Sequence, residues 1–164
     1  MGAKMNIVIK EGYAYPDKIE KLFAEYTQML IENDREFADY LVLQNYDDEI
    51  KHLEHKYGAP WGRLYIALDG EKAAGCIAMR KIDTENCEMK RLYVRPEYRG
   101  RGIAKALVNK IILDAKDIGY KHILLDTLPF LKGAIALYKS LGFYEVESYN
   151  GSPMDNLIYL KFDI

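Results

Sequence analysis

Several residue patterns are missing from this chain, and each absence excludes a class of protein. No apolar run approaches the length of about eighteen residues that a membrane-spanning helix needs, and the N-terminus has no apolar signal-peptide segment. We therefore expect a cytoplasmic protein that makes no membrane contact. The two cysteines, Cys76 and Cys87, have no C-x-x-C spacing, and the expected strand pairing does not place them opposite each other. Neither a disulfide nor a redox pair is expected.

Metal-binding patterns are also scarce. His52 and His55 stand three residues apart beside Glu49 in a segment of partly helical periodicity, a spacing that can place ligands on one helical face. No third strong ligand stands nearby in the sequence. We therefore expect solvent-exposed helix surface there, and no metal site.

Charge is unevenly distributed along the chain, whose net charge is −2. Residues 1–60 contain 7 Lys or Arg and 12 Asp or Glu, whereas residues 61–164 contain 16 and 13, so the first part is acidic and the second basic. This asymmetry suits a protein that binds an anionic cofactor on one side and a cationic partner on the other. The negative net charge disfavours nucleic-acid binding.

Hydrophobic periodicity predicts an α/β fold of the α+β kind, in a single domain that spans residues 1–164. Helical periodicity covers residues 16–31, 103–118 and 131–141, and residues 37–57 are expected to form helical pieces with a break near Asn45. Alternating or continuous apolar segments predict strands at residues 5–11, 63–68, 73–82, 87–94, 122–128, 143–148 and 156–162.

The connections between these strands predict a mixed sheet. Short turns join residues 63–68, 73–82 and 87–94, as in an antiparallel meander. A long helix separates residues 87–94 from residues 122–128, so these two strands should be parallel. We expect a mostly antiparallel sheet of about seven strands, flanked by helices. Its closing strand, if unpaired, would permit a homodimer.

The apolar phase changes within the strand at residues 87–94. Met89 is apolar, yet the next strongly apolar positions are Leu92 and Val94, where strict alternation would place Arg91 and Tyr93. A β-bulge near Lys90 to Leu92 would restore the phase and free main-chain groups for other partners. The alternative is a regular strand with apolar surroundings on both sides and a solvated Arg91.

The sequence RGRGIA, residues 99–104, joins that strand to the long helix. A helix start has unpaired N–H groups and positive potential, so this turn can hold a phosphate, and Gly100 and Gly102 allow close approach of the backbone. The chain lacks a Walker lysine loop. A dinucleotide fingerprint is excluded because Lys105 occupies its third glycine position and the turn follows an antiparallel meander.

The remaining pattern, R-x-x-G-x-A, resembles the acetyl-CoA signature of the GNAT superfamily of N-acetyltransferases. The surrounding RLYVRPEYRGRGIAKAL, the later AIALYKSLGF and the order of elements across the chain are also similar to that family. The resemblance implies acetyl-CoA as co-substrate and a splayed pair of parallel strands. It also implies that main-chain N–H groups of one turn hold the pyrophosphate, namely those of Arg99, Gly100, Arg101, Gly102, Ile103 and Ala104.

The same resemblance assigns roles in catalysis. The pantetheine arm would lie along Leu92, Tyr93 and Val94, with the Val94 N–H polarising the thioester carbonyl. Tyr138 is implied as the general acid, the alternative being a core aromatic residue. Many relatives carry Asn where this chain has Leu131, so we expect altered contacts to the cofactor at that position.

The general base is left open between two carboxylates and water. Glu88 lies upstream on the strand with the bulge, where similar enzymes often place a glutamate, and the alternative is an exposed strand carboxylate. Asp126 is the second candidate, although it can instead pair with Arg91 or Arg80.

The predicted function is acetyl transfer from acetyl-CoA to a primary amine of a small molecule or peptide, by direct attack in a ternary complex. A catalytically weak acetyl-CoA-binding sensor is the alternative. The acidic first third mildly favours a cationic acceptor. In similar proteins the acceptor groove is bordered by the first helices, the loop around Trp61 and the final hairpin, here with Tyr149 and Asn150.

Overall fold

The computed structural model describes residues 6–43 and 45–164, and its centre is a seven-stranded sheet in the order β1-β2-β3-β4-β5-β7-β6. All neighbouring strands are antiparallel except β4 and β5, which confirms the predicted mixed sheet. The expected first strand began at Met5, which lies outside the described residues. The strands are β1 (Ile7–Glu11), β2 (Arg63–Asp69), β3 (Lys72–Lys81), β4 (Asn86–Val94), β5 (His122–Thr127), β6 (Tyr144–Val146) and β7 (Ile158–Asp163).

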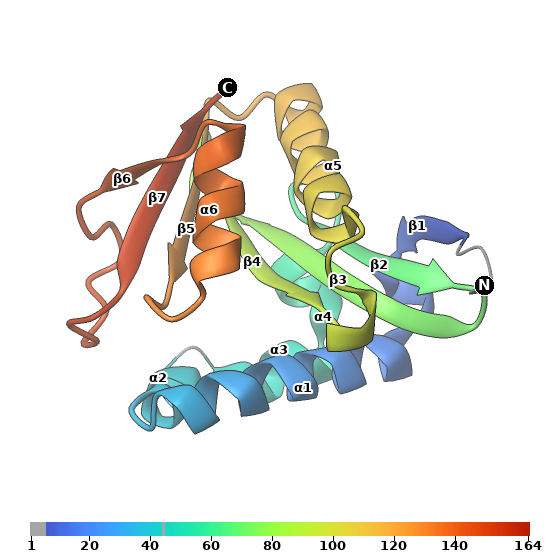
Figure 1. Cartoon of the computed structure of the whole chain (residues 1–164). Coiled ribbons are helices and arrows are strands. Elements are labelled where there is room, and N and C mark those ends of the chain that lie inside the picture. Colours follow the sequence, from blue (N-terminus) through green and yellow to red (C-terminus); the bar gives the residue numbers. More distant parts are fainter. Residues whose placement is uncertain (1–5, 44) are drawn as a thin grey trace.

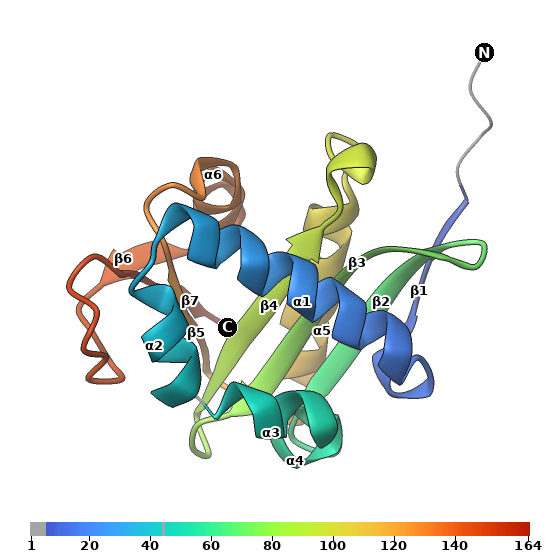
Figure 2. The same cartoon turned by 90° about the horizontal axis from the view of Figure 1, so that it is seen from below.

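Helices cover both faces of the sheet. In Figures 1 and 2, α1 to α4 lie on one face, and α5 and α6 lie on the other. The segment expected to form broken helical pieces does so: the helix stops before Asn45, which has a left-handed backbone, and breaks again at His52. The helices are α1 (Pro16–Asn33), α2 (Phe37–Leu43), α3 (Tyr46–Lys51), α4 (Leu53–Tyr57), α5 (Ile103–Ile118) and α6 (Lys132–Leu141), with the 3₁₀ helices η1 (Gly12–Ala14) and η2 (Pro96–Tyr98).

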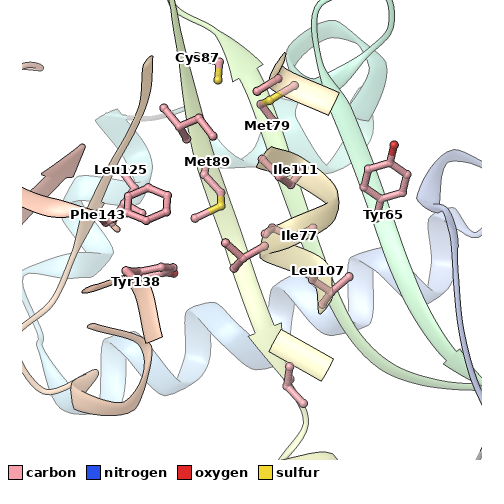
Figure 3. Packing of buried hydrophobic residues seen from close by; sticks show 14 of the residues in the cluster. Tyr65, Ile77, Met79, Cys87, Met89, Leu107, Ile111, Leu125, Tyr138 and Phe143 are labelled. Atoms are coloured by element: carbon pink, nitrogen blue, oxygen red, sulfur yellow. The ribbon is translucent and has the colours of Figure 1, made fainter. Parts of the chain in front are cut away.

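Apolar side chains fill both sides of the central strands. On β2, Leu64 and Ile66 pack toward α1, whereas Tyr65 and Ala67 pack toward α5. The core on the α5 side is shown in Figure 3, where side chains of β3 and β4 meet α5, and Tyr138 of α6 lies beside the same core. Because both faces are covered, β2 and β3 are apolar at nearly every position rather than alternating.

The predicted β-bulge in β4 is confirmed. Cys76 of β3 pairs with Tyr93, and Ala78 pairs with Lys90, so Arg91 and Leu92 together oppose one residue of β3. Arg91 has a left-handed backbone with φ 62°. The extra residue in the bulge shifts the alternation of side chains along β4. Leu92 and Val94 therefore lie on the same face of the sheet as Met89, as the apolar pattern predicted.

Only the first residues of β4 pair with β5. The two strands pair only where Asn86–Glu88 lie beside His122–Leu124, and in Figure 1 they diverge below that point. The rest of β4, from Met89 to Val94, therefore has no strand partner on that side within the described chain. The splayed parallel pair that the family resemblance implied is present.

The two cysteines and the two neighbouring histidines lie in different surroundings. Cys76 and Cys87 are buried and free, and in the strand register they face Tyr93 and Lys81. The rings of His52 and His55 stack at 4.8 Å on exposed surface. Among residues 6–43 and 45–164 no group of three or more potential ligands can hold a metal ion, and no helix is long and apolar enough to cross a membrane.

Candidate active site

The gap between β4 and β5 opens into a cavity of about 510 Å³, here called the large cavity. Residues from distant parts of the chain meet there: Tyr26 and Met29 of α1, and Leu137 and Tyr138 of α6. Seven of the residues predicted to contact a cofactor line it, namely Leu92, Tyr93, Val94, Arg99, Gly100, Ala104 and Leu131. The others, Arg101, Gly102 and Ile103, belong to the same turn but do not line the cavity.

The free edge of β4 offers a main-chain donor to the large cavity. The Arg95 N–H donates to the Ala74 carbonyl at 2.9 Å, and Val94 precedes it in an antiparallel pair with Gly75. Main-chain donors alternate between the two sides of a strand, so the Val94 N–H points away from β3 and into the gap left by β5. This position is not occupied by any strand of the described chain.

The turn before α5 supplies further donors. Gly100 and Gly102 have φ of 76° and 80°, which other residues adopt only with strain. In the described part of the chain, the N–H groups of Gly100, Gly102, Ile103 and Ala104 donate to no main-chain carbonyl. The Arg99 N–H differs, since it donates to Pro96 at 3.2 Å. Free donors at a helix start form an anion site.

Tyr138 lies at the wall of the large cavity, packed against Phe143 at 5.6 Å between ring centroids. Only 6% of the residue is exposed. Burial raises the pKa of the phenol well above its ordinary value, so it stays protonated near neutral pH. The side chain packs in the core and also lines the cavity, and its role as a general acid stays a prediction.

A second cavity of about 380 Å³, here called the outer cavity, lies farther along the same cleft. Glu88 lines the outer cavity rather than the large one, and it is buried, not exposed. Its Oε1 lies 2.7 Å from Arg80 Nε and 3.7 Å from Lys90 Nζ, and its Oε2 accepts from the Tyr149 hydroxyl at 2.5 Å. Burial alone would raise the pKa of Glu88, but Lys90 and Arg80 outweigh it and the pKa is lowered.

A narrow hollow of about 30 Å³, here called the neck, has lining residues in common with both cavities. It shares Tyr26 and Leu131 with the large cavity and Lys90 with the outer one. Asp126 lines the neck, where its Oδ2 accepts from the Tyr40 hydroxyl at 2.9 Å and from the Asn150 amide at 2.8 Å.

The expected pairing of Asp126 with Arg91 or Arg80 is wrong. Arg80 is bound to Glu88, and Arg91 is turned away by the bulge toward α3. Bidentate hydrogen bonds join the Arg91 guanidinium to Glu49, from Nε to Oε2 at 2.7 Å and from Nη2 to Oε1 at 2.8 Å.

The Glu49–Arg91 ion pair was not predicted from the sequence. Both side chains are almost fully buried, and Lys56 Nζ also lies 2.7 Å from Glu49 Oε1. Local patterns gave no signal for it, because 42 residues separate the partners. The apolar positions around Arg91 indicated only that a charged side chain had entered a buried strand, where it needs a partner.

Trp61 was expected near the acceptor, as in similar proteins, but it lines neither the outer cavity nor the neck. Its ring lies under Lys81, and its carbonyl accepts from the Tyr120 hydroxyl at 2.9 Å. Tyr149 and Asn150 of the β6–β7 connection do border the outer part of the cleft.

Comparison with known proteins shows the family of the chain. The model of the acetyltransferase (GNAT) family matches residues 19–143, a span that contains β4, the glycine turn, α5 and α6. The chain therefore belongs to the GNAT acetyltransferase family. An uncharacterized N-acetyltransferase of Schizosaccharomyces pombe is 40% identical over 150 residues, which cover 90% of this chain and 88% of that protein. The GNAT protein described here is accordingly an N-acetyltransferase.

Solved structures share the GNAT fold. An acetyltransferase from Streptococcus agalactiae superposes with a TM-score of 0.78 at 23% identity, covering 96% of this chain and 98% of that one. The PaiA N-acetyltransferase from Thermoplasma acidophilum, solved in complex with coenzyme A, gives a TM-score of 0.75 at 18% identity over 98% of this chain and 100% of that one.

Proposed function

We propose that this GNAT protein, acting through one domain over residues 1–164, transfers the acetyl group of acetyl-CoA to a primary amine of a small molecule or peptide. The observation that carries the proposal is the large cavity, which brings together a free strand edge, the glycine turn that begins α5 and a buried phenol. When bound, acetyl-CoA supplies an activated acyl group and a thiolate leaving group. Cytoplasmic location fits this function and remains a prediction.

The roles of the cavity residues follow from their chemistry. The N–H groups of Gly100, Gly102, Ile103 and Ala104 would hold the pyrophosphate together with the rest of this turn, and Arg99 and Arg101 would add positive charge. Leu92, Tyr93 and Val94 would carry the pantetheine arm as an added strand. Leu131, in place of an amide side chain, gives this arm an apolar contact.

The reaction would proceed by direct attack within a ternary complex. The lone pair of the neutral amine forms a bond to the acetyl carbon, the Val94 N–H stabilises the negative charge that develops on the carbonyl oxygen, and the carbon–sulfur bond then breaks. The Tyr138 hydroxyl donates its proton to the departing thiolate. The nitrogen loses a proton to a base on the acceptor side, which yields the amide.

The base stands on the acceptor side of the cleft, as Asp126, Glu88 or a water held by either. The two cationic neighbours of Glu88 lower its pKa, which makes it a weaker proton acceptor. Asp126 lies in the neck between the two cavities, nearer to where the amine must meet the thioester, and it pairs with neutral donors. We therefore propose Asp126 as the more direct acceptor, with Glu88 acting through water.

A thiol-release assay over a panel of amines, with acetyl-CoA as donor, tests this function. We expect turnover of at least one class of primary amine and a matching mass increase of 42 Da, which is roughly one acetyl group, on the product. Calorimetric binding of acetyl-CoA without thiol release from any amine would reject the proposed function and leave a binding protein.

Replacement of Gly100 by Ala should weaken acetyl-CoA binding by about tenfold, which corresponds to 1.4 kcal/mol. A Cβ at φ 76° strains the turn whose N–H groups face the phosphate. The matched control is Gly70→Ala, at φ 62° in the β2–β3 turn and outside the large cavity. Calorimetry should show similar Kd values for the control and the wild type; equal losses in both variants would mean that strain alone, and not the phosphate site, is responsible.

A further inference from the structure

The outer cavity contains more positive than negative side chains. Lys56 of α4, Arg80 of β3 and Lys90 of β4 line it, and Glu88 is the carboxylate among its described lining residues. Three separate elements therefore direct cations toward one space. The bulge contributes to this arrangement, since Lys90 precedes it and stays on the face of β4 that Glu88 also uses.

The carboxylates nearby do not balance these cations. Glu88 is shared between Arg80 and Lys90, and Glu49 is shared between Lys56 and Arg91. Asp126 also acts on Lys90, so three carboxylates face these four cations. Burial, followed by the neighbouring Arg91, lowers the pKa of Lys90 to about 8, although Glu88 and Asp126 act in the opposite direction. An anion bound in the outer cavity would restore the balance.

The guanidinium of Arg80 has N–H donors that do not bind Glu88. Its Nε is bound to Glu88, while its Nη1 has only a 3.4 Å contact to the Lys81 carbonyl, and about a third of the side chain is exposed. The guanidinium fork matches a carboxylate in shape. The outer cavity also has neutral donors at its rim in Tyr40 and Asn150, both of which are bound to Asp126.

A carboxylate lies at the inner end of the cleft. Asp126 faces the neck, between the outer cavity and the large cavity that holds Tyr138. Lys90 and Arg91 also line the neck, but Lys90 is paired with Glu88 and Arg91 with Glu49. Asp126 is therefore the carboxylate of the neck that an acceptor amine can face as it approaches the thioester.

We propose that the acceptor is an amino acid, with its carboxylate bound by Lys56, Arg80 and Lys90 and its amino group facing Asp126. This inference rests on the proposed acetyltransferase function and names its substrate class. It replaces the cationic acceptor that the acidic first third favoured, because several acidic residues of that segment are already paired, as Glu25 is with Arg95 and Glu49 is with Arg91. The outer cavity itself carries the opposite charge.

Matched acceptors that differ only at the carboxylate provide the test. Thiol release would be measured with α-amino acids, with the corresponding primary amides and with the decarboxylated amines. We expect kcat/KM to be at least about tenfold higher for the acids, mainly through KM, because charge-assisted hydrogen bonds to a carboxylate are lost in the other two.

Two substitutions then connect this preference to the outer cavity. Lys56→Gln and Arg80→Gln should each reduce the ratio of kcat/KM for acid over amide, and Arg80→Lys should restore part of it. Lys139→Gln, which removes an exposed cation paired with Glu145 on the surface, should leave the ratio unchanged. Circular dichroism would confirm that each variant is folded.

The outcomes separate this inference from the function on which it rests. Equal or faster turnover of the amides or decarboxylated amines would overturn the amino-acid acceptor while supporting acetyl transfer to amines. Absence of turnover with every amine, despite binding of acetyl-CoA, would overturn both. A preference for acids that Lys56→Gln and Arg80→Gln leave intact would show that the carboxylate binds elsewhere, and would also overturn the inference.

Discussion

Replacement of Tyr138 by Phe should lower kcat for acetyl transfer about 100-fold, the lower end of the usual contribution of a general acid. The change removes only the hydroxyl that would protonate the departing thiolate. The ring, which packs against Phe143 in the core, is retained, so we expect the fold and the Kd for acetyl-CoA to change little. Steady-state kinetics and calorimetry with the same variant separate these effects.

The matched control for this prediction is Tyr120→Phe. That residue is also buried, and its hydroxyl donates to the Trp61 carbonyl away from the large cavity. Its kcat should stay within a few-fold of the wild type. If Tyr138→Phe also retained kcat within a few-fold, the phenol would be a packing residue, and the thiolate would take its proton from solvent.

Replacement of Glu49 by Ala should lower the free energy of unfolding by about 3 to 5 kcal/mol, the usual cost of breaking a buried ion pair. The substitution leaves the guanidinium of Arg91 buried without its bidentate partner and removes the carboxylate that Lys56 also contacts. Because Arg91 forms the bulge, we also expect weaker binding of acetyl-CoA along the edge of β4. Urea denaturation and calorimetry would measure the two losses.

Asp48→Ala, a substitution at an exposed position of the same helix, is the control and should change the free energy of unfolding little.

A second measurement follows the stability of the folded protein with pH. Burial would raise the pKa of Glu49, but Arg91 and Lys56 lower it from 4.5 to about 2. The ion pair therefore stabilises the folded state fully above about pH 4.5, and this contribution is lost as the pH falls toward 2. The same acid sensitivity in Glu49→Gln would assign it to other carboxylates.

The local parts of this fold were accessible from the sequence. The change of apolar phase from Met89 to Leu92 identified the bulge, because a strand buried on both faces must keep its side chains in register with the core. The glycine turn before α5 was identifiable for a similar reason: positive φ at Gly100 and Gly102 leaves few alternatives for residue type. Both features depend on residues that are adjacent in the sequence.

The charged network was not accessible in this way. Glu88 was read as an exposed or catalytic carboxylate, yet its environment is set by Arg80 on an adjacent strand and by Tyr149 in the β6–β7 connection. Arg91 was one of two possible ion-pair partners for Asp126, but it pairs with Glu49 from the left-handed backbone of the bulge. Partner choice among buried charges depends on three-dimensional direction, which periodicity does not encode.

The short pairing between β4 and β5 also bears on aggregation. An unpaired strand edge on the rim of a sheet is a template for intermolecular association, and here the edge from Met89 to Val94 has no strand beside it on the β5 side. That edge does not lie on the rim. It forms one wall of a cleft that is flanked by side chains of α1 and α6, and these side chains stand in the way of a second polypeptide chain. The protein thus keeps an open strand edge for its chemistry without offering it to other copies of itself.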